Sequence, residues 1–256
     1  MIDLSYQNRF GGLERLWGAG ALPRLQAAHV LVVGLGGVGS WAVEALARSG
    51  VGTLTLVDLD DVCATNTNRQ LHALDPEWGR LKADVLADRV RKINPEADVA
   101  AVADFVTEKS AAGVLAASPD LVVDAIDSVP DKAALAALCL ERGIPLVMSG
   151  GAGGRTDPTR VRLDDLGRER GDALLKAVKR GLKARGHAPD AQGVWNIACV
   201  FSEEPPILPW DVCSVPKPGE GGSAAIDCAT GFGAAAFATG AFGLTLASAA
   251  VRRLLA

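Results

Sequence analysis

Two groups of residues near the start of the chain have the types and spacing to bind a nucleotide. The first is a glycine-rich segment with Gly34, Gly36, Gly37 and Gly39. Glycines at a strand-to-helix turn let backbone N–H groups approach phosphate oxygens closely. The second is Asp58, which lies about 20 residues further on, where an acid can accept hydrogen bonds from ribose hydroxyls. Together they favour a nucleotide with a free ribose.

The surrounding residues predict the elements that must position this chemistry. Residues 29–33 form a short apolar, β-branched run, and residues 38–48 have the apolar spacing of a helix. The glycines therefore lie at the turn between a strand and a helix, whose positive end points toward the ligand. Residues 53–57 predict the next parallel strand, and Asp58 follows it directly.

A nicotinamide dehydrogenase would explain these features equally well, so the segment after Asp58 carries the distinction. Such an enzyme usually continues toward another helix, whereas this chain enters a polar loop with Asp60, Asn66, Arg69 and Gln70. A second acid suits a hydrated Mg²⁺, and an arginine with a carboxamide suits a triphosphate. Redox transfer needs neither, so the loop favours ATP.

Two further charged residues are candidates for the same site. Lys82 belongs to a helical pattern whose apolar residues face inward, which leaves its side chain free to reach the ligand. Residues 121–128 predict a buried strand that ends near Asp127, and open parallel sheets bind ligands at the carboxyl ends of their strands. Taken alone, Lys82 could be a surface lysine and Asp127 a helix cap. Their order along the chain supports a shared function.

This order resembles the ubiquitin-activating superfamily, whose enzymes adenylate carboxylates with ATP. Within it, the chain looks like the tRNA threonylcarbamoyladenosine dehydratase branch, and the likeness spans nearly the whole sequence. The motifs that carry the likeness are Arg9-Phe10-Gly11-Gly12, Asn66-Thr67-Asn68-Arg69-Gln70, Asp124-Ala125-Ile126-Asp127-Ser128, Gly150-Gly151-Ala152-Gly153-Gly154 and Asp227-Cys228-Ala229-Thr230-Gly231-Phe232-Gly233.

The resemblance implies ATP-dependent cyclisation of a threonylcarbamoyl group on an adenosine beside the tRNA anticodon. The threonyl carboxylate would be adenylated, and intramolecular attack would close a five-membered ring with loss of AMP. In this scheme Asp58 binds ribose, and Lys82 neutralises charge at the α-phosphate. The remaining implied ligands are Asn66 and Arg69 for the phosphates, and Asp127 and Asp60 for Mg²⁺.

Two alternative functions stay open: an adenylating enzyme for the C-terminus of a ubiquitin-like or sulfur-carrier protein, and a NAD-dependent oxidoreductase. Sulfur-carrier activators usually hold a structural zinc in two Cys-x-x-Cys pairs. The five cysteines here, at positions 63, 139, 199, 213 and 228, include no such pair, so we expect no structural zinc. Cys228 is either a catalytic thiol or a packed one, and the adjacent Asp227 disfavours a thiolate.

Several segments suggest binding partners. A helix over residues 174–183 presents Lys176, Lys179, Arg180 and Lys183 opposite its apolar face, where a tRNA backbone could bind; a solvated lysine face is the alternative. Relatives are commonly homodimers in which an N-terminal arginine reaches the partner's ATP, which makes Arg9 and Arg15 candidates. A sulfur-relay protein is a further candidate partner.

Two glycine-rich or apolar segments allow more than one interpretation. Gly150 and Gly151 follow an apolar strand, where N–H groups suit the substrate carboxylate and carbonyls suit a monovalent cation, Na⁺ or K⁺. Residues 228–251 contain no charged residue, and this segment is long enough for a membrane helix. Their many small residues favour a buried core or dimer-interface helix over inner-membrane association.

We therefore predict an α/β, Rossmann-like fold with a mainly parallel sheet, helices on both faces and a less regular C-terminal extension. The 256 residues suffice for one adenylating-enzyme domain. Its parts are an N-terminal helical arm (1–28), a nucleotide-binding core (29–150), and a substrate- and tRNA-facing part with a C-terminal apolar helix (151–256). An odd number of scattered cysteines argues for a cytoplasmic, reducing environment.

Overall fold

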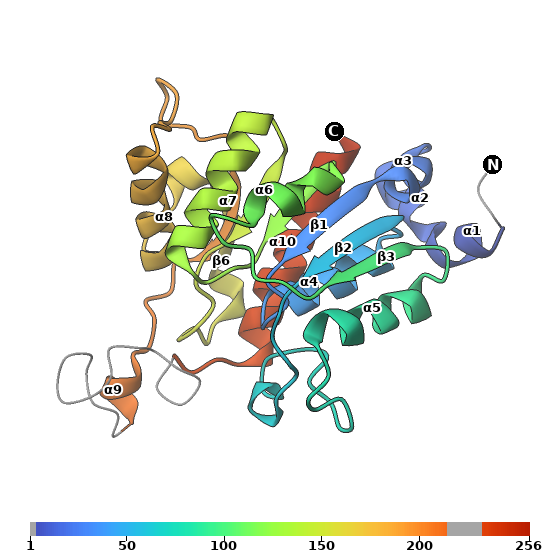
Figure 1. Ribbon diagram of the computed structural model, residues 1–256, viewed down its shortest axis with the longest axis horizontal. Helices are drawn as coiled ribbons and strands as arrows, with labels where there is room; N and C mark the ends of the chain where they lie inside the picture. The colour runs from blue at the N-terminus through green and yellow to red at the C-terminus, as the bar shows by residue number, and fades with distance from the viewer. Residues whose placement is uncertain (1–3, 214–231) are drawn as a thin grey trace.

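The computed structural model describes residues 4–213 and 232–256, and a sheet forms the centre of this part of the chain (Figure 1). Its seven strands lie in the order β3-β2-β1-β4-β5-β7-β6, and all neighbouring pairs are parallel except β6 with β7. The strands are β1 (His29–Val33), β2 (Thr53–Val57), β3 (Asp98–Val102), β4 (Leu121–Asp124), β5 (Leu146–Ser149), β6 (Val161–Asp165) and β7 (Ala198–Ser202).

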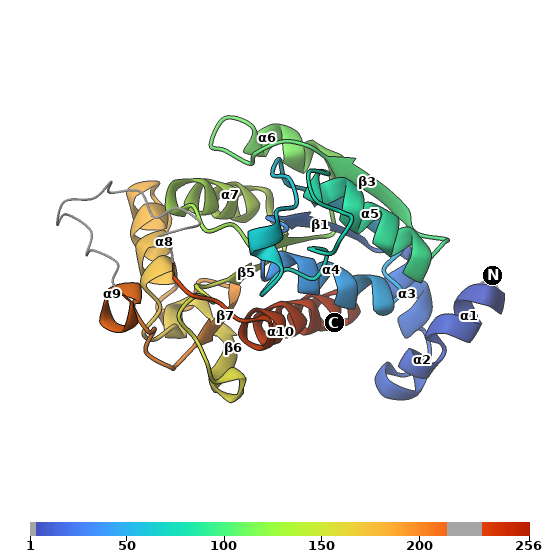
Figure 2. The same cartoon turned by 90° about the horizontal axis from the view of Figure 1, so that it is seen from below.

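Helices cover both faces of the sheet, as predicted, and Figure 2 shows the layers. One core lies beneath α3 (Ala21–Ala27), α4 (Gly39–Arg48), α5 (Lys82–Ile93) and α10 (Ala236–Leu255). The other lies beneath α6 (Ala111–Val114), α7 (Val129–Arg142) and α8 (Ala173–Ala184). Strand side chains alternate between the faces: Val30 and Val32 enter the first core, whereas Leu31 and Val33 enter the second.

The strand order places a ligand site near the centre of the sheet. The chain moves outward from β1 through β2 to β3, then returns to the other side of β1 to form β4 and β5. At such a reversal the loops after the two central strands diverge, which opens a crevice at their carboxyl ends. The glycine-rich segment follows β1, and the segment with Asp127 follows β4.

The N-terminal residues form a helical arm at the amino ends of the strands, at the right of Figure 1. Its helices are α1 (Leu4–Phe10), α2 (Gly12–Trp17) and α3. The Tyr6 ring is fully buried and stacks at a tilt on Phe10, and its hydroxyl donates a hydrogen bond to the Gly50 carbonyl, just before β2. The arm is therefore held at the opposite end of the sheet from the glycine turn.

The C-terminal apolar helix, α10, packs against α4 and the sheet. A side-chain carbon at Gly243 would overlap the Val38 carbonyl and the Trp41 side chain, so glycine allows the two helices this close approach. The opposite side of α10 leaves Phe237 57% and Leu244 51% exposed. Among the described residues, no helix combines the length and apolar character needed to cross a membrane.

The described residues of the second half of the chain extend the sheet. It adds two strands to the sheet, including the antiparallel edge strand β6, together with α8, α9 (Pro209–Val212) and α10. The strand expected over residues 121–128 is shorter, because β4 ends at Asp124 and the following residues form a loop. Cys139 and Cys199 are buried in the second core, whereas Cys63 and Cys213 are exposed. Cys228 lies outside the described residues.

Candidate nucleotide-binding and active site

The glycine turn joins β1 to α4, and two of its glycines are required by close packing. Gly34 has φ +82°, and a side-chain carbon there would lie 2.9 Å from the Ala125 carbonyl carbon. A side-chain carbon at Gly39 would overlap the Gly34 carbonyl oxygen. A side-chain carbon at Gly36 would lie 3.9 Å from Gln70 Nε2, in ordinary contact, and one at Gly37 would lie 3.1 Å from the Thr239 side chain. The absence of side chains at these two positions leaves their backbone accessible to a phosphate group.

Asp58 is held against the glycine turn by two backbone hydrogen bonds. Its Oδ2 accepts from the Leu35 N–H at 2.6 Å, and its Oδ1 accepts from the Asp60 N–H at 2.8 Å. Each carboxylate oxygen has a second lone pair, which can accept from a hydroxyl. The structure therefore places Asp58, the residue predicted to bind ribose, beside the predicted phosphate-binding turn. The two hydrogen bonds fix the orientation of its carboxylate.

The loop that carries Asp127 is organised by a buried ion pair that the sequence analysis missed. Lys132, on α7, is fully buried, and its Nζ lies 2.9 Å from Asp124 Oδ1 at the end of β4. The same ammonium donates to the carbonyls of Asp124 and Ile126, and Asp124 Oδ1 accepts from the Ile126 N–H. Burial raises the pKa of Asp124, and the Lys132 charge opposes that rise.

These contacts fold the residues after β4 into a tight loop against Gly34 and leave Asp127 exposed at its outer side. The Asp127 carboxylate forms no hydrogen bond or ion pair with another described residue. A signal for the buried pair exists in the sequence, since Lys132 lies at helical spacing from the apolar Leu135, Ala136 and Cys139.

The polar loop after β2 brings Arg69 close to the glycine turn, and local turns hold Asn66 within the loop. Asn66 is buried at the end of a short 3₁₀ turn (Ala64–Asn66), and its Oδ1 accepts from the Cys63 N–H at 3.3 Å. The Arg69 carbonyl accepts from Trp41 Nε1 and Thr239 Oγ1, which ties the loop to α4 and α10. The Arg69 guanidinium donates to the Thr65 carbonyl. Both side chains therefore have structural hydrogen bonds in addition to any role with phosphates.

Lys82 is placed differently from our prediction. It begins α5 with its side chain only 6% exposed, and its Nζ forms a 2.6 Å ion pair with Asp60 Oδ2, whereas the Asp60 side chain is 54% exposed. The expectation of a freely extending lysine was wrong, because α5 starts at Lys82 and packs this residue into the protein. Asp60 and Lys82 are instead each other's partner at the rim of the site.

A buried histidine that the sequence analysis did not select lies close enough to Lys82 to feel its charge. His72 is 1% exposed, and neither ring nitrogen has a hydrogen-bond partner among the described residues. Burial, and then the Lys82 charge, lower the pKa of His72 to about 4. The imidazole is therefore neutral near pH 7 and adds no positive charge to that of Lys82.

Of the two predicted Mg²⁺ ligands, Asp127 fits that role better. Mg²⁺ bound with a nucleotide typically uses one or two carboxylates, phosphate oxygens and water. Asp127 offers an exposed carboxylate at the carboxyl end of β4, free of described partners. The Asp60 carboxylate is already paired with the Lys82 ammonium. The chemistry of the donors thus suits a nucleotide-bound cation at Asp127.

The glycine loop after β5 does not offer the N–H groups that we predicted for the substrate carboxylate. The Gly150 N–H donates to the Val200 carbonyl, and the Gly151 N–H donates to Asp172 Oδ2 at 2.9 Å. Binding of the substrate through these two N–H groups is therefore the wrong interpretation, since both are used within the protein. The alternative in which carbonyls bind Na⁺ or K⁺ stays a prediction.

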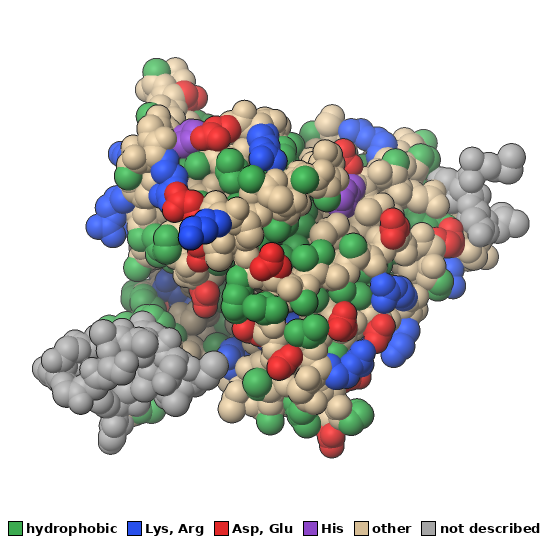
Figure 3. All heavy atoms as spheres, viewed as in Figure 1, with side chains coloured by type: hydrophobic (Ala, Val, Ile, Leu, Met, Phe, Trp, Pro, Cys, Tyr) green, Lys and Arg blue, Asp and Glu red, His purple; other side chains and the backbone are tan. Residues whose placement is uncertain are grey.

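The basic helix α8 has the predicted amphipathic arrangement, with one exception. Leu175, Val178 and Leu182 are buried. Lys179 is 21% exposed and forms a 2.7 Å ion pair with the buried Glu169. The exposed basic residues are Lys176, Arg180 and Lys183. Figure 3 shows basic and acidic side chains together over this end of the molecule.

The two N-terminal arginines lie far from the glycine turn of their own chain. Arg9 is on α1, where it forms a 3.8 Å ion pair with Glu96, and Arg15 is exposed on α2. Both helices lie at the amino ends of the strands, whereas the glycine turn and Asp58 lie at the carboxyl ends. Neither arginine can therefore complete the site of its own chain.

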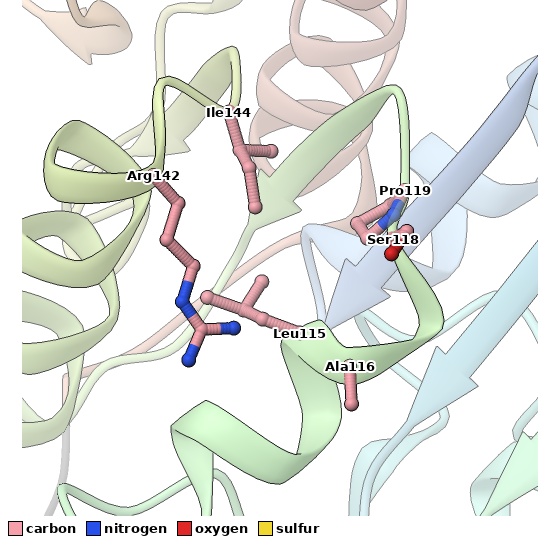
Figure 4. A pocket seen from close by; sticks show the side chains of 6 residues that line it. All are labelled: Leu115, Ala116, Ser118, Pro119, Arg142 and Ile144. Atoms are coloured by element: carbon pink, nitrogen blue, oxygen red, sulfur yellow. The ribbon is translucent and has the colours of Figure 1, made fainter.

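A shallow pocket elsewhere on the surface is distinct from this site (Figure 4). It encloses about 330 Å³ and lies near the amino ends of β4 and β5, because Pro119 and Ile144 precede those strands. Its lining residues are Leu115, Ala116, Ser118, Pro119, Arg142 and Ile144. The lining has one cation and one hydroxyl among apolar side chains, and the pocket lies at the end of the sheet opposite the glycine turn, so it does not match a nucleotide site.

Comparison with known proteins agrees with the geometry. The chain matches the ThiF family over residues 11–256. It is similar to the tRNA threonylcarbamoyladenosine dehydratase of Escherichia coli, with 46% identity over 260 residues that cover 100% of this chain and 97% of the relative. The dehydratase of Haemophilus influenzae is 44% identical, with 98% and 95% covered.

A solved structure supports the same relationship. The crystal structure of the E. coli tRNA N6-threonylcarbamoyladenosine dehydratase in complex with ATP has a TM-score of 0.88 to this chain, at 44% identity. The match covers 99% of this chain and 96% of that one. The glycine turn, the fixed ribose acid and a likeness over the full length thus agree, and the chain belongs to the ThiF family, among its tRNA threonylcarbamoyladenosine dehydratases.

Proposed function

We propose that this protein is an ATP-dependent dehydratase that cyclises the threonylcarbamoyl group of an adenosine beside the tRNA anticodon. The observation that carries the proposal is the glycine turn with Asp58 fixed against it, in a chain whose full-length relatives bear this name. One such relative is solved in complex with ATP. An unreactive carboxylate must be activated before it can lose water, and adenylation supplies that activation.

The arrangement of the site suggests how this chain binds ATP. The two free lone pairs of Asp58 accept from ribose hydroxyls, and the N–H groups of Gly36 and Gly37 donate to phosphate oxygens at the positive end of α4. Lys82 and Arg69 offset the negative charge that develops on the α-phosphate and the leaving pyrophosphate. When bound with ATP, Mg²⁺ would be held by Asp127 and would neutralise phosphate charge.

The reaction balances as one adenylation followed by one ring closure. A carboxylate oxygen of the threonyl group attacks the α-phosphate and displaces pyrophosphate, which gives a mixed anhydride with AMP. An atom of the carbamoyl group then attacks the activated carbonyl carbon, a carbamoyl N–H gives up its proton, and the bond to AMP breaks. The substrate has lost one water overall. Because the nucleophile and electrophile belong to the same molecule, the protein contributes chiefly by orienting them.

The deciding experiment incubates the protein with ATP, Mg²⁺ and tRNA that carries threonylcarbamoyladenosine. We expect AMP and pyrophosphate release that depends on the modified tRNA, and a nucleoside lighter by one water on digestion. Pyrophosphate release that depends instead on a small protein ending in Gly-Gly would favour the sulfur-carrier or ubiquitin-like alternative. Binding of NAD with no retention of ATP would support the oxidoreductase alternative and overturn the proposal.

We also propose that tRNA contacts the outer face of α8. Lys176, Arg180 and Lys183 are exposed there and can contact phosphates, whereas Lys179 is neutralised by Glu169. Binding of this kind depends on salt because each contact releases condensed counterions. The proposed surface therefore comprises three basic side chains rather than the four that the sequence suggested.

A homodimer that shares its active sites would give the N-terminal arginines a role. Arg9 and Arg15 lie at the amino ends of their own strands, so only a second copy could bring either one to an ATP site. The exposed Phe237 and Leu244 on α10 provide apolar surface that a second copy could cover. Mixing a Lys82→Ala chain with an Arg9→Ala or Arg15→Ala chain tests this proposal. Activity recovered in the mixture supports a shared site, and no recovery argues against it.

A further inference from the structure

Arg155 is a buried cation that the reaction scheme above does not use. The residue is 5% exposed, and its Nε and Nη1 are buried without a hydrogen-bond partner among the described residues. Arginine is almost never fully buried unless it is paired. Burial lowers the pKa of Arg155, although Asp172 and Glu204 oppose that shift. The protein therefore keeps two of the three guanidinium nitrogens out of water without a direct hydrogen bond to a described residue.

The position of Arg155 relates this cation to the active site. It directly follows the glycine loop after β5, and β5 is the neighbour of β4, whose following loop carries Asp127. Both loops leave the same carboxyl edge of the sheet, where the ligand crevice of such folds lies. Arg155 is thus one strand further from β1 than the Asp127 loop, on the side opposite Asp58 and the ribose.

The contacts around Arg155 fix its loop, and none of those described uses its Nε or Nη1. Asp172 is 1% exposed, with Oδ2 accepting from the Gly151 N–H and Oδ1 from the Leu175 N–H at the start of α8. Glu204 accepts from the N–H groups of Thr156 and Asp157, immediately after Arg155. Both acids are therefore occupied by neighbouring N–H groups. They balance the charge of Arg155 through space only.

We propose that Arg155 binds the substrate carboxylate before it is adenylated, and so makes this protein select acceptors that carry a free acid. This inference rests on the proposed function and deepens it. The Gly150 and Gly151 N–H groups are used internally, whereas Nε and Nη1 of Arg155, in the segment that follows them, have no described partner. Arginine suits the task because its planar donors match a carboxylate.

The proposed contact has a chemical consequence for the reaction. Arg155 would screen the repulsion between the carboxylate and the α-phosphate as the two anions approach. Once the carboxylate becomes a mixed anhydride it is no longer charged, so its hold on the guanidinium weakens and the acyl group is released for ring closure. Because the interaction favours the ground state, its loss should raise KM more than it lowers kcat.

The test compares three anticodon stem-loops: one with threonylcarbamoyladenosine, one with its methyl ester and one with unmodified adenosine. We expect the wild-type protein to bind the free acid about 10- to 100-fold more tightly than the ester, as one charge-assisted contact allows. Arg155→Gln and Arg155→Met should lose this discrimination and raise KM for the modified RNA, with ATP affinity unchanged. Arg162→Gln, an exposed arginine on β6, is the matched control and should retain it.

Three results would overturn the inference. Equal weakening of all three RNAs by Arg155→Gln would assign the residue to a phosphate of the RNA. Unaltered discrimination would assign it no role in binding. A large loss of thermal stability in Arg155→Met with discrimination retained would make it structural, because removing an unpaired buried cation should leave stability unchanged or increased. Wild-type protein that releases no AMP with modified RNA would refute the proposed function itself, and the binding comparison would still test Arg155.

Discussion

Replacement of Lys82 by methionine separates a catalytic role from a structural one, because the two roles predict effects of very different size. The Lys82–Asp60 pair has a buried cation but a 54% exposed carboxylate. Solvent screens such a pair, so its loss should cost about 1 kcal/mol of stability or less. Removing one preorganised donor from a developing phosphate charge costs about 2 to 4 kcal/mol of transition-state stabilisation.

Lys82→Met should therefore reduce kcat by about 30- to 1000-fold with little change in the free energy of unfolding. Methionine keeps most of the buried stem, which limits the cavity. The assay is AMP release at saturating ATP and modified tRNA, with calorimetry for ATP affinity and urea titration for stability. A variant that turns over at the wild-type rate would remove Lys82 from the mechanism.

Asp60→Asn is the matched control, since it breaks the same ion pair and leaves Lys82 in place. If Asp60 only neutralises Lys82, activity should stay within a few-fold of wild type and the Mg²⁺ dependence should not change. A higher Mg²⁺ concentration for half-maximal rate would instead make Asp60 a metal ligand, as the sequence suggested. The two variants together determine which partner of the pair acts on ATP.

Three further outcomes are expected. His72 has a pKa of about 4 in the folded protein, so the unfolded chain binds a proton there more readily. The free energy of unfolding should therefore fall as the pH drops from about 6.5 to 4. His72→Phe should abolish roughly 3 kcal/mol of that loss in urea titrations, and an unchanged pH slope would contradict this account. Lys132→Met leaves Asp124 buried without its cation and should cost about 3 to 5 kcal/mol of stability. Adding Asp124→Asn should recover part of that loss. A loss below about 1 kcal/mol would show that the buried Lys132–Asp124 ion pair does not hold the loop. Charge reversal on α8 at Lys176, Arg180 and Lys183 should weaken tRNA binding and reduce its salt dependence, while ATP affinity stays constant. Unchanged tRNA binding would reject this surface.

The sequence predicted the local structure around the glycine turn well. A short apolar strand, a glycine turn and an amphipathic helix follow one another in the chain, so their arrangement depends on neighbouring residues and on the few ways a strand can join a helix. Gly34, Gly39 and Asp58 could be identified for this reason, and the structure places them together. The parallel sheet followed from the same alternation of strands and helices.

The tertiary structure decided which charged residues are buried and which of them are paired. Lys82 and Asp60 are 22 positions apart, and Arg155 lies beside Asp172 and Glu204 only because β5, α8 and the segment after β7 converge. Burial depends on all the elements that pack around a residue, whereas a pattern in the chain records only its neighbours. Hydrophobic spacing therefore determined the fold and the glycine turn. Long-range packing determined the electrostatics of the site, because the interaction energy between charges depends on how much water the surrounding fold excludes.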